Sequence, residues 1–91
     1  MERAKLVKAD GTTKTIEPKD GKKFSLEEMQ TLVGGFIEIV RTHDDEHYMI
    51  IDEEGKLKGK PVNFTATCLY RYGDLDVVVG DALVCPTSMI D

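Results

Sequence analysis

The segment His43-Asp44-Asp45-Glu46-His47 carries two imidazoles and three carboxylates, the side chains that most often bind metal ions. Its spacing matches H-x-x-E-H, a zinc-peptidase pattern that needs both histidines on one face of a helix. Thr42, Asp44 and Asp45 are poor helix formers, and β-type segments flank the pentapeptide on both sides. We therefore expect a solvated hairpin loop, with no metal site and no catalytic role.

A second set of chemistry-bearing residues follows in the loop that holds Lys56, Lys58 and Lys60. The lysines alternate around Leu57 just before Asn63, a residue type that caps helices. Ammonium groups and the free N–H groups of a helix start could converge there on an anion. The sequence therefore offers a small basic lip as a candidate ligand site, and a solvated loop is the alternative.

No nucleophile with a neighbouring base is apparent. Ser25 occupies the place of a helix cap and Ser88 lies close to the last residue, and neither has a histidine and an acid nearby in the sequence. Cys68 and Cys85 are far apart and lack CxxC spacing, so we expect buried thiols rather than zinc ligands or a disulfide. We expect no enzyme activity and no cofactor.

Length, composition and charge limit the number of domains, the class of partner and the location of the protein. The 91 residues, 41% apolar and 32% charged, fit one domain over 1–91. Residues 1–24 hold seven basic against four acidic side chains and the rest hold five against thirteen, so the net charge of −5 disfavours nucleic acid as a partner. No apolar run approaches the roughly 20 residues that span a bilayer, and no secretory signal is apparent. We expect a cytoplasmic protein.

The first half of the chain predicts a hairpin and a helix. Two short β segments between residues 3 and 16 flank Asp10-Gly11, a pair that favours a tight primed turn. A capping box at Ser25 and Glu28 then predicts the start of a helix. The apolar residues of this helix share one face, and Gly34-Gly35 ends it with a left-handed cap.

The second half predicts another hairpin, a helix and a strand. Segments 36–40 and 48–51 are β-branched and aromatic, and Asn63 can cap a helix over 64–72 that ends at Gly73. A final strand over 77–84 carries a bulge or turn at Gly80, and residues 86–91 are expected to form a frayed tail.

The resulting order is ββαββαβ, which predicts an α+β fold: a small single-layer, mainly antiparallel sheet with two short helices. We expect both helices on one face of the sheet, where helix and sheet bury their apolar sides together. An exposed edge strand would allow a homo-oligomer.

Several motifs in this order resemble a known pattern. They are Leu26-x-x-Met29-Gln30-x-x-Val33-Gly34-Gly35-Phe36-Ile37-Glu38, Asp52-Glu53-Glu54-Gly55-Lys56-Leu57, Pro61-Val62-Asn63 and Val79-Gly80-Asp81-Ala82-Leu83-Val84. Together they are similar to a domain-of-unknown-function family of small proteins carried by phages, plasmids and conjugative elements of bacteria. The resemblance covers residues 25–85 and, more loosely, the first hairpin.

The resemblance implies an accessory protein that works in the cytoplasm of a bacterial host. Such proteins often act without chemistry, and the leading hypothesis is a counter-defence or host-takeover protein that binds a host protein. The alternative is a sponge that sequesters a small nucleotide signal, with a structural accessory protein as a third reading. A sponge would use the ligand-binding candidates Lys56, Lys58, Lys60, Asn63, Arg71 and Tyr70, the tyrosine stacking on a base.

Overall fold

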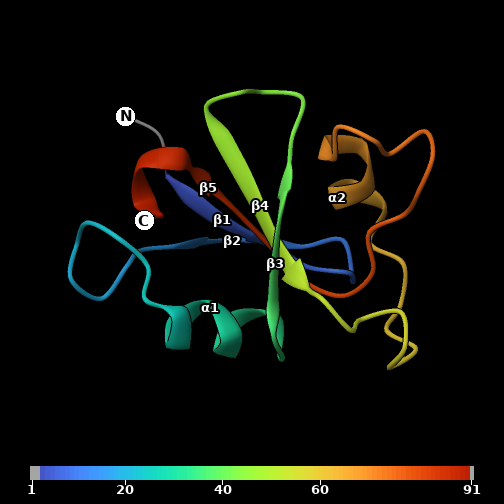
Figure 1. The fold of residues 1–91 in the computed structure, drawn as a ribbon, viewed down its shortest axis with the longest axis horizontal. Helices are drawn as coiled ribbons and strands as arrows, with labels where there is room; N and C mark the ends of the chain where they lie inside the picture. The colour runs from blue at the N-terminus through green and yellow to red at the C-terminus, as the bar shows by residue number, and fades with distance from the viewer. Residues whose placement is uncertain (1–2, 91) are drawn as a thin grey trace.

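The structure, a computed structural model, describes residues 3–90. Its five strands form one antiparallel sheet in the order β2-β1-β5-β4-β3 (Figure 1). The last strand of the chain therefore lies at the centre, between the two hairpins. The α+β fold and the order ββαββαβ are confirmed. The strands are β1 Ala4–Val7, β2 Thr13–Ile16, β3 Ile37–Arg41, β4 His47–Asp52 and β5 Ala82–Pro86.

The first hairpin is present, but its turn differs from the primed turn that Asp10-Gly11 predicts. Gly11 has φ +93°, and none of the described non-glycine residues has a positive φ, whereas a type I′ turn needs two. The Lys8 amide donates to the Thr12 carbonyl at 2.8 Å, which leaves a three-residue loop. The Asp10 carboxylate accepts hydrogen bonds from the Thr12 amide and hydroxyl and holds that loop.

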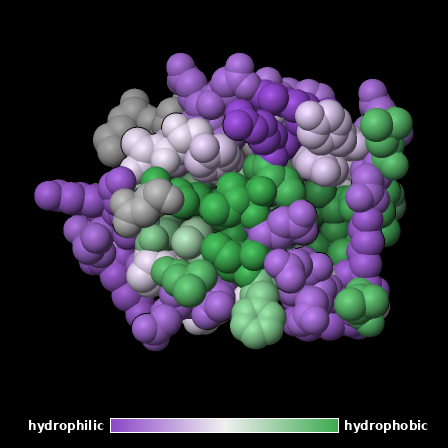
Figure 2. Space-filling view, viewed as in Figure 1, coloured by the Kyte–Doolittle hydropathy of each residue, from purple (hydrophilic) through white to green (hydrophobic). Residues whose placement is uncertain are grey.

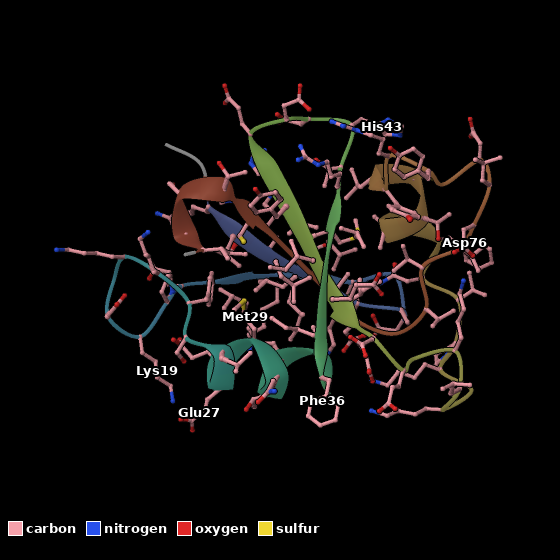
Figure 3. All side chains as sticks on the ribbon, in the orientation of Figure 1. Lys19, Glu27, Met29, Phe36, His43 and Asp76 are labelled. Atoms are coloured by element: carbon pink, nitrogen blue, oxygen red, sulfur yellow. The ribbon has the colours of Figure 1, made fainter. Side chains whose placement is uncertain are left out.

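Helix α1, Leu26–Val33, begins and ends as its sequence predicts. The Ser25 hydroxyl accepts from the Glu28 amide while the Glu28 carboxylate accepts from the Ser25 amide, which completes the capping box. Gly34 has φ +82° and ends the helix in the left-handed conformation. Met29 and Val33 are buried against Ile50 and Leu83 of the sheet, and Figure 3 shows Met29 pointing from α1 toward the strands.

Helix α2, Phe64–Leu69, lies on the opposite face of the sheet, so the expectation of both helices on one face is wrong. Ala66 packs in a second cluster with Met49 and Ala82, whereas the next residues along those strands, Ile50 and Leu83, pack toward α1. Successive side chains of a strand point to opposite faces. Because consecutive residues of β4 and β5 are buried, both faces of the sheet must be packed against other parts of the chain, α1 on one face and α2 on the other.

Helix α2 is also shorter than the predicted 64–72 segment. Tyr70 leaves the helix with φ −69° and ψ +132°, and it forms a bridge with Thr42 beside the end of β3. Phe64, its first residue, is 77% exposed, and Ala66 is the buried residue of the helix. A long-range bridge between two backbones thus ends this helix before Gly73.

The C-terminal part differs from its prediction at both ends. Gly80 has φ +75° and interrupts the 77–84 segment, so β5 begins at Ala82 and Val79 forms only a bridge with Val62. The tail is not frayed over its described part: Thr87–Met89 form a 3-10 turn (η1), and the Phe24 amide donates to the Met89 carbonyl at 2.9 Å. Ile90 is buried in the core, and Asp91 lies outside the described residues.

Within residues 3–90, none of the helices is both long and apolar enough to cross a membrane.

Candidate functional site

Two of the three candidate lysines converge on a buried carboxylate. The Nζ atoms of Lys58 and Lys60 each lie 2.8 Å from Oδ2 of Asp52, which is the last residue of β4. Oδ1 of the same carboxylate accepts the Glu54 amide at 2.9 Å. We call Asp52, Lys58 and Lys60 the Asp52 cluster.

The Asp52 cluster also neutralises the end of helix α1. Lys60 Nζ donates to the Val33 carbonyl at 2.7 Å and Lys58 Nζ to the Gly34 carbonyl at 3.1 Å. The last turn of α1 contains no basic residue of its own, so these lysines supply the positive charge that a helix C-terminus favours. Burial alone would raise the pKa of Asp52, but the hydrogen bonds from the two lysines and from Glu54 outweigh it and lower the pKa to about 2.

The glycines of the motifs make room for this cluster. A Cβ on Gly35 would lie 2.5 Å from Lys58 Nζ and 2.8 Å from Asp52 Oδ1. A Cβ on Gly80 would lie 2.8 Å from Cδ of Lys60. The Gly34-Gly35 pair and Gly80 therefore allow both lysines to reach their partners.

Asn63 is 1% exposed and serves the fold rather than a ligand. Its side-chain oxygen accepts the Ala66 amide at 3.0 Å, which caps α2 as the sequence predicts. Its side-chain nitrogen donates to the carbonyls of Val7 and Gly80 at 2.8 and 2.9 Å. The side chain thus joins β1, the start of α2 and the turn before β5, and its polar groups are fully used.

The remaining candidates lie in other places. Arg71 Nε donates to the Thr42 carbonyl at 3.0 Å, and its guanidinium pairs with Asp45 in the β3–β4 loop. Lys56 pairs with Asp76. The ring of Tyr70 meets that of Tyr72 edge to face, with 5.9 Å between the centroids. The structure therefore does not gather the six candidates around one ligand.

Lys56 and Tyr70 do line a common hollow, which we call the acidic groove. It is a space of about 140 Å³ between the α2-facing side of β3 and β4 and the segment 76–79. Three of its lining residues, Glu38, Glu53 and Asp76, are acidic with no part in the Asp52 cluster, and Lys56 is the one basic residue of the lining. Asp52 also lines the groove, but its carboxylate is buried against Lys58 and Lys60. A pocket for a drug-sized ligand measures about 300–1,000 Å³, so the groove has the size of one side chain. Its lining is Glu38, Val40, Ile51, Asp52, Glu53, Lys56, Leu57, Tyr70, Asp76, Val77, Val78 and Val79.

A larger hollow of about 450 Å³ lies between the end of β2 and helix α1. Glu17, Glu27 and Glu28 line it together with one lysine, Lys19, so it too is predominantly acidic. None of the six predicted ligand-binding residues belongs to it.

Residues 43–46 form the loop of the second hairpin, as the sequence predicts, and His47 is the first residue of β4 (Figure 3). His47 Nδ1 lies 2.7 Å from Asp44 Oδ2, and the Thr42 hydroxyl donates to the Asp44 carbonyl. In the part of the chain that the structure describes, no three histidine, cysteine or acidic side chains are grouped as metal ligands. Burial raises the pKa of the Cys85 thiol to about 12, whereas Cys68 is exposed, contrary to its prediction.

The sequence reasoning missed Glu38 as a groove residue and the open edge of β3 beside it. Glu38 reads only as an exposed position in a strand, because its neighbours in the groove come from β4 and from residues 70–79. The alternation Ile37-Glu38-Ile39 is the available signal for a charged side chain on one side of this strand, and Val40 and Arg41 do not continue it.

The model of the family described as "Domain of unknown function (DUF3846)" matches residues 3–89. The chain belongs to this family. The match spans every strand and helix, from β1 to η1. No curated protein and no solved structure matches the chain. The motifs that carried the resemblance include Gly34-Gly35, Asp52, Asn63 and Gly80. These residues form or make room for the Asp52 cluster and the Asn63 hydrogen bonds, so these parts of the motifs stabilise the fold.

Proposed function

We propose that this chain is a non-enzymatic binding protein whose partner is another protein. In the setting that the resemblance implies, it is an accessory protein of a phage or other mobile element and acts in the bacterial cytoplasm. There it occupies a host factor, in counter-defence or host takeover.

The observation that carries this proposal is a group of exposed apolar side chains at the end of the molecule formed by α2 and its neighbouring loops. Leu57 and Leu75 are 86% and 85% exposed, and Phe64 is 77% exposed. The two loops that hold the leucines are joined by the Lys56–Asp76 ion pair. The loop that holds Leu75 lies beside α2, and the loop that holds Leu57 lies below it at the same end of the molecule (Figure 1). Exposed aromatic and aliphatic groups of this size favour a protein interface. We call Leu57, Phe64, Tyr72, Leu75 and Val77 the α2-end patch.

The charges favour the same class of partner over a nucleotide. Each candidate cation is already engaged: Lys58 and Lys60 by Asp52, Lys56 by Asp76 and Arg71 by Asp45. A phosphate would have to displace these carboxylates, and the acidic groove would repel it. A protein surface with apolar and basic groups meets neither obstacle.

The test is capture of partners from a bacterial lysate, followed by native mass spectrometry, with matched variants. Phe64→Ser combined with Leu75→Ser removes two exposed anchors from the patch, and we expect it to weaken capture of a protein about tenfold or more. Leu26→Ser, an exposed apolar residue on α1, is the control and should leave capture unchanged. Added mass of nucleotide size, or equal capture by all three proteins, would contradict the proposal.

A further inference from the structure

The outer edge of β3 is open over its first half and closed over its second. The Arg71 amide donates to the Arg41 carbonyl at 2.9 Å, and the His43 amide donates to the Leu69 carbonyl at 3.2 Å. The segment 69–71 therefore covers β3 from Arg41 onward. On its other side β3 pairs with β4, where Glu38 lies opposite Ile51 and Val40 lies opposite Met49.

Backbone groups of alternate residues point to opposite sides of a strand. The Arg41 carbonyl and the His43 amide point away from β4, toward the segment 69–71. The Phe36 carbonyl points toward β4, because it accepts a hydrogen bond from the Glu53 amide. It follows that Ile37 and Ile39 direct their N–H and C=O groups to the open edge, whereas Glu38 and Val40 direct theirs to β4. Four hydrogen-bonding groups are thus available to an added strand.

The side chains along this edge differ between the two faces of the sheet. Ile37 and Ile39 lie on the α1 side, where Ile37 packs against the same core cluster as Leu32 and Tyr48 and Ile39 is 45% exposed. Figure 2 shows apolar atoms gathered where β3 runs toward α1. Glu38 lies on the other side, at the acidic groove, with Glu53, the residue that follows β4. Phe36, directly before the strand, is 64% exposed and points outward (Figure 3).

A second copy of the chain does not suit this edge. In a symmetric antiparallel pair, the segment 69–71 leaves only the first half of β3 free to pair. Ile37 of one copy then faces Ile39 of the other, and the two copies of Glu38 lie directly opposite each other. Like charges directly opposite each other destabilise a strand pair, and charged residues on edge strands prevent such pairing. The edge strand β2 is less suited still to an apolar partner, because Thr13, Lys14 and Thr15 are all exposed and polar.

We propose that the β3 edge binds an extended segment of a partner protein in which a lysine or arginine lies between two large apolar residues. This inference deepens the proposed function, on which it rests. The segment adds a strand beside Ile37 and Ile39, whose backbone groups supply the hydrogen bonds. Its apolar side chains cover Ile39 and its neighbours on the α1 side. Its basic side chain lies between Glu38 and Glu53 at the acidic groove, whose size suits one side chain.

The test uses a blocked synthetic peptide, Thr-Val-Arg-Ile-Thr, and residue-resolved amide hydrogen exchange by NMR. At a free peptide concentration about ten times the dissociation constant, we expect exchange at Ile37 and Ile39 to slow about tenfold. The amides of Glu38 and Val40 already face β4 and serve as internal controls. A peptide N-methylated at its valine and isoleucine amides cannot complete the pairing and should give no protection.

A charge exchange tests the basic position. Replacing the peptide arginine by glutamate should weaken binding about threefold or more, and Glu38→Lys should reverse that preference. Glu38 is exposed, so this variant should keep the melting temperature of the parent chain. Unchanged exchange at Ile37 and Ile39, or the same peptide preference in both proteins, would overturn the inference. Capture of a protein through the α2-end patch would then still support the proposed function. Edge protection together with failed capture would contradict the proposed function instead.

Discussion

At the scale of the residue, Asp52 is the carboxylate on which the fold depends most directly. It is buried at the end of β4, and its two oxygens accept hydrogen bonds from two lysines and one amide. Replacement by asparagine leaves Lys58 and Lys60 without their counter-charge beside the end of α1. We expect Asp52→Asn to lower the free energy of unfolding by about 2 kcal/mol, measured by urea denaturation at neutral pH. Asp74→Asn, at an exposed carboxylate, is the matched control and should change it by less than about 0.5 kcal/mol.

The same carboxylate predicts a pH dependence whose sign follows from its lowered pKa. The pKa of Asp52 is about 2 in the folded chain against an ordinary value of 3.8, so the unfolded chain takes up the proton first as the pH falls. Its contribution to stability is therefore complete above pH 3.8 and is lost between there and about 2. In urea titrations across this range, the difference between the parent chain and Asp52→Asn should shrink. A constant difference would show that the ionised carboxylate is not the source of the effect.

At the scale of the element, the end of α1 tests whether Gly34 is chosen for its backbone. Its φ of +82° lies in the left-handed region, which alanine adopts at a cost of about 1 kcal/mol. We expect Gly34→Ala to lower the unfolding free energy by about that amount, and Gly34→Asn to lower it less, because asparagine tolerates this conformation better. Chemical denaturation of both variants measures the two losses. Equal stability of the alanine variant and the parent chain would contradict the cap.

Elements that are specified by neighbouring residues could be predicted from the sequence. The capping box at Ser25, the left-handed stop at Gly34 and the Asn63 cap involve contacts across a few positions, and all three are confirmed. Elements that depend on distant backbones were predicted with errors. Helix α2 ends early because Tyr70 bridges to Thr42, and β5 starts late because the turn at Gly80 is held by Asn63.

At the scale of the whole molecule, sequence reasoning identified charged residues but not their partners. Lys58 and Lys60 are close to Asp52 in the chain, yet the carbonyls that complete their coordination belong to the end of α1. A loop rich in lysine therefore reads as an anion site, although three-dimensional packing uses two of its cations internally. The acidic groove was missed for the related reason that its walls come from three separate parts of the chain.

The last prediction concerns the state of assembly. Glu38 is the charged residue at the open half of the β3 edge, flanked by Ile37 and Ile39. We expect the parent chain to be monomeric and Glu38→Val to self-associate, because valine removes the repulsion between paired copies and extends the apolar edge. Sedimentation velocity over a range of concentrations measures the difference. Glu27→Val removes the same charge from the exposed side of α1 (Figure 3) and should stay monomeric. Dimerisation of the parent chain, with slowed exchange at Ile37 and Ile39, would instead assign this edge to a second copy. If Glu38 prevents self-pairing, the edge stays available to a partner of opposite charge.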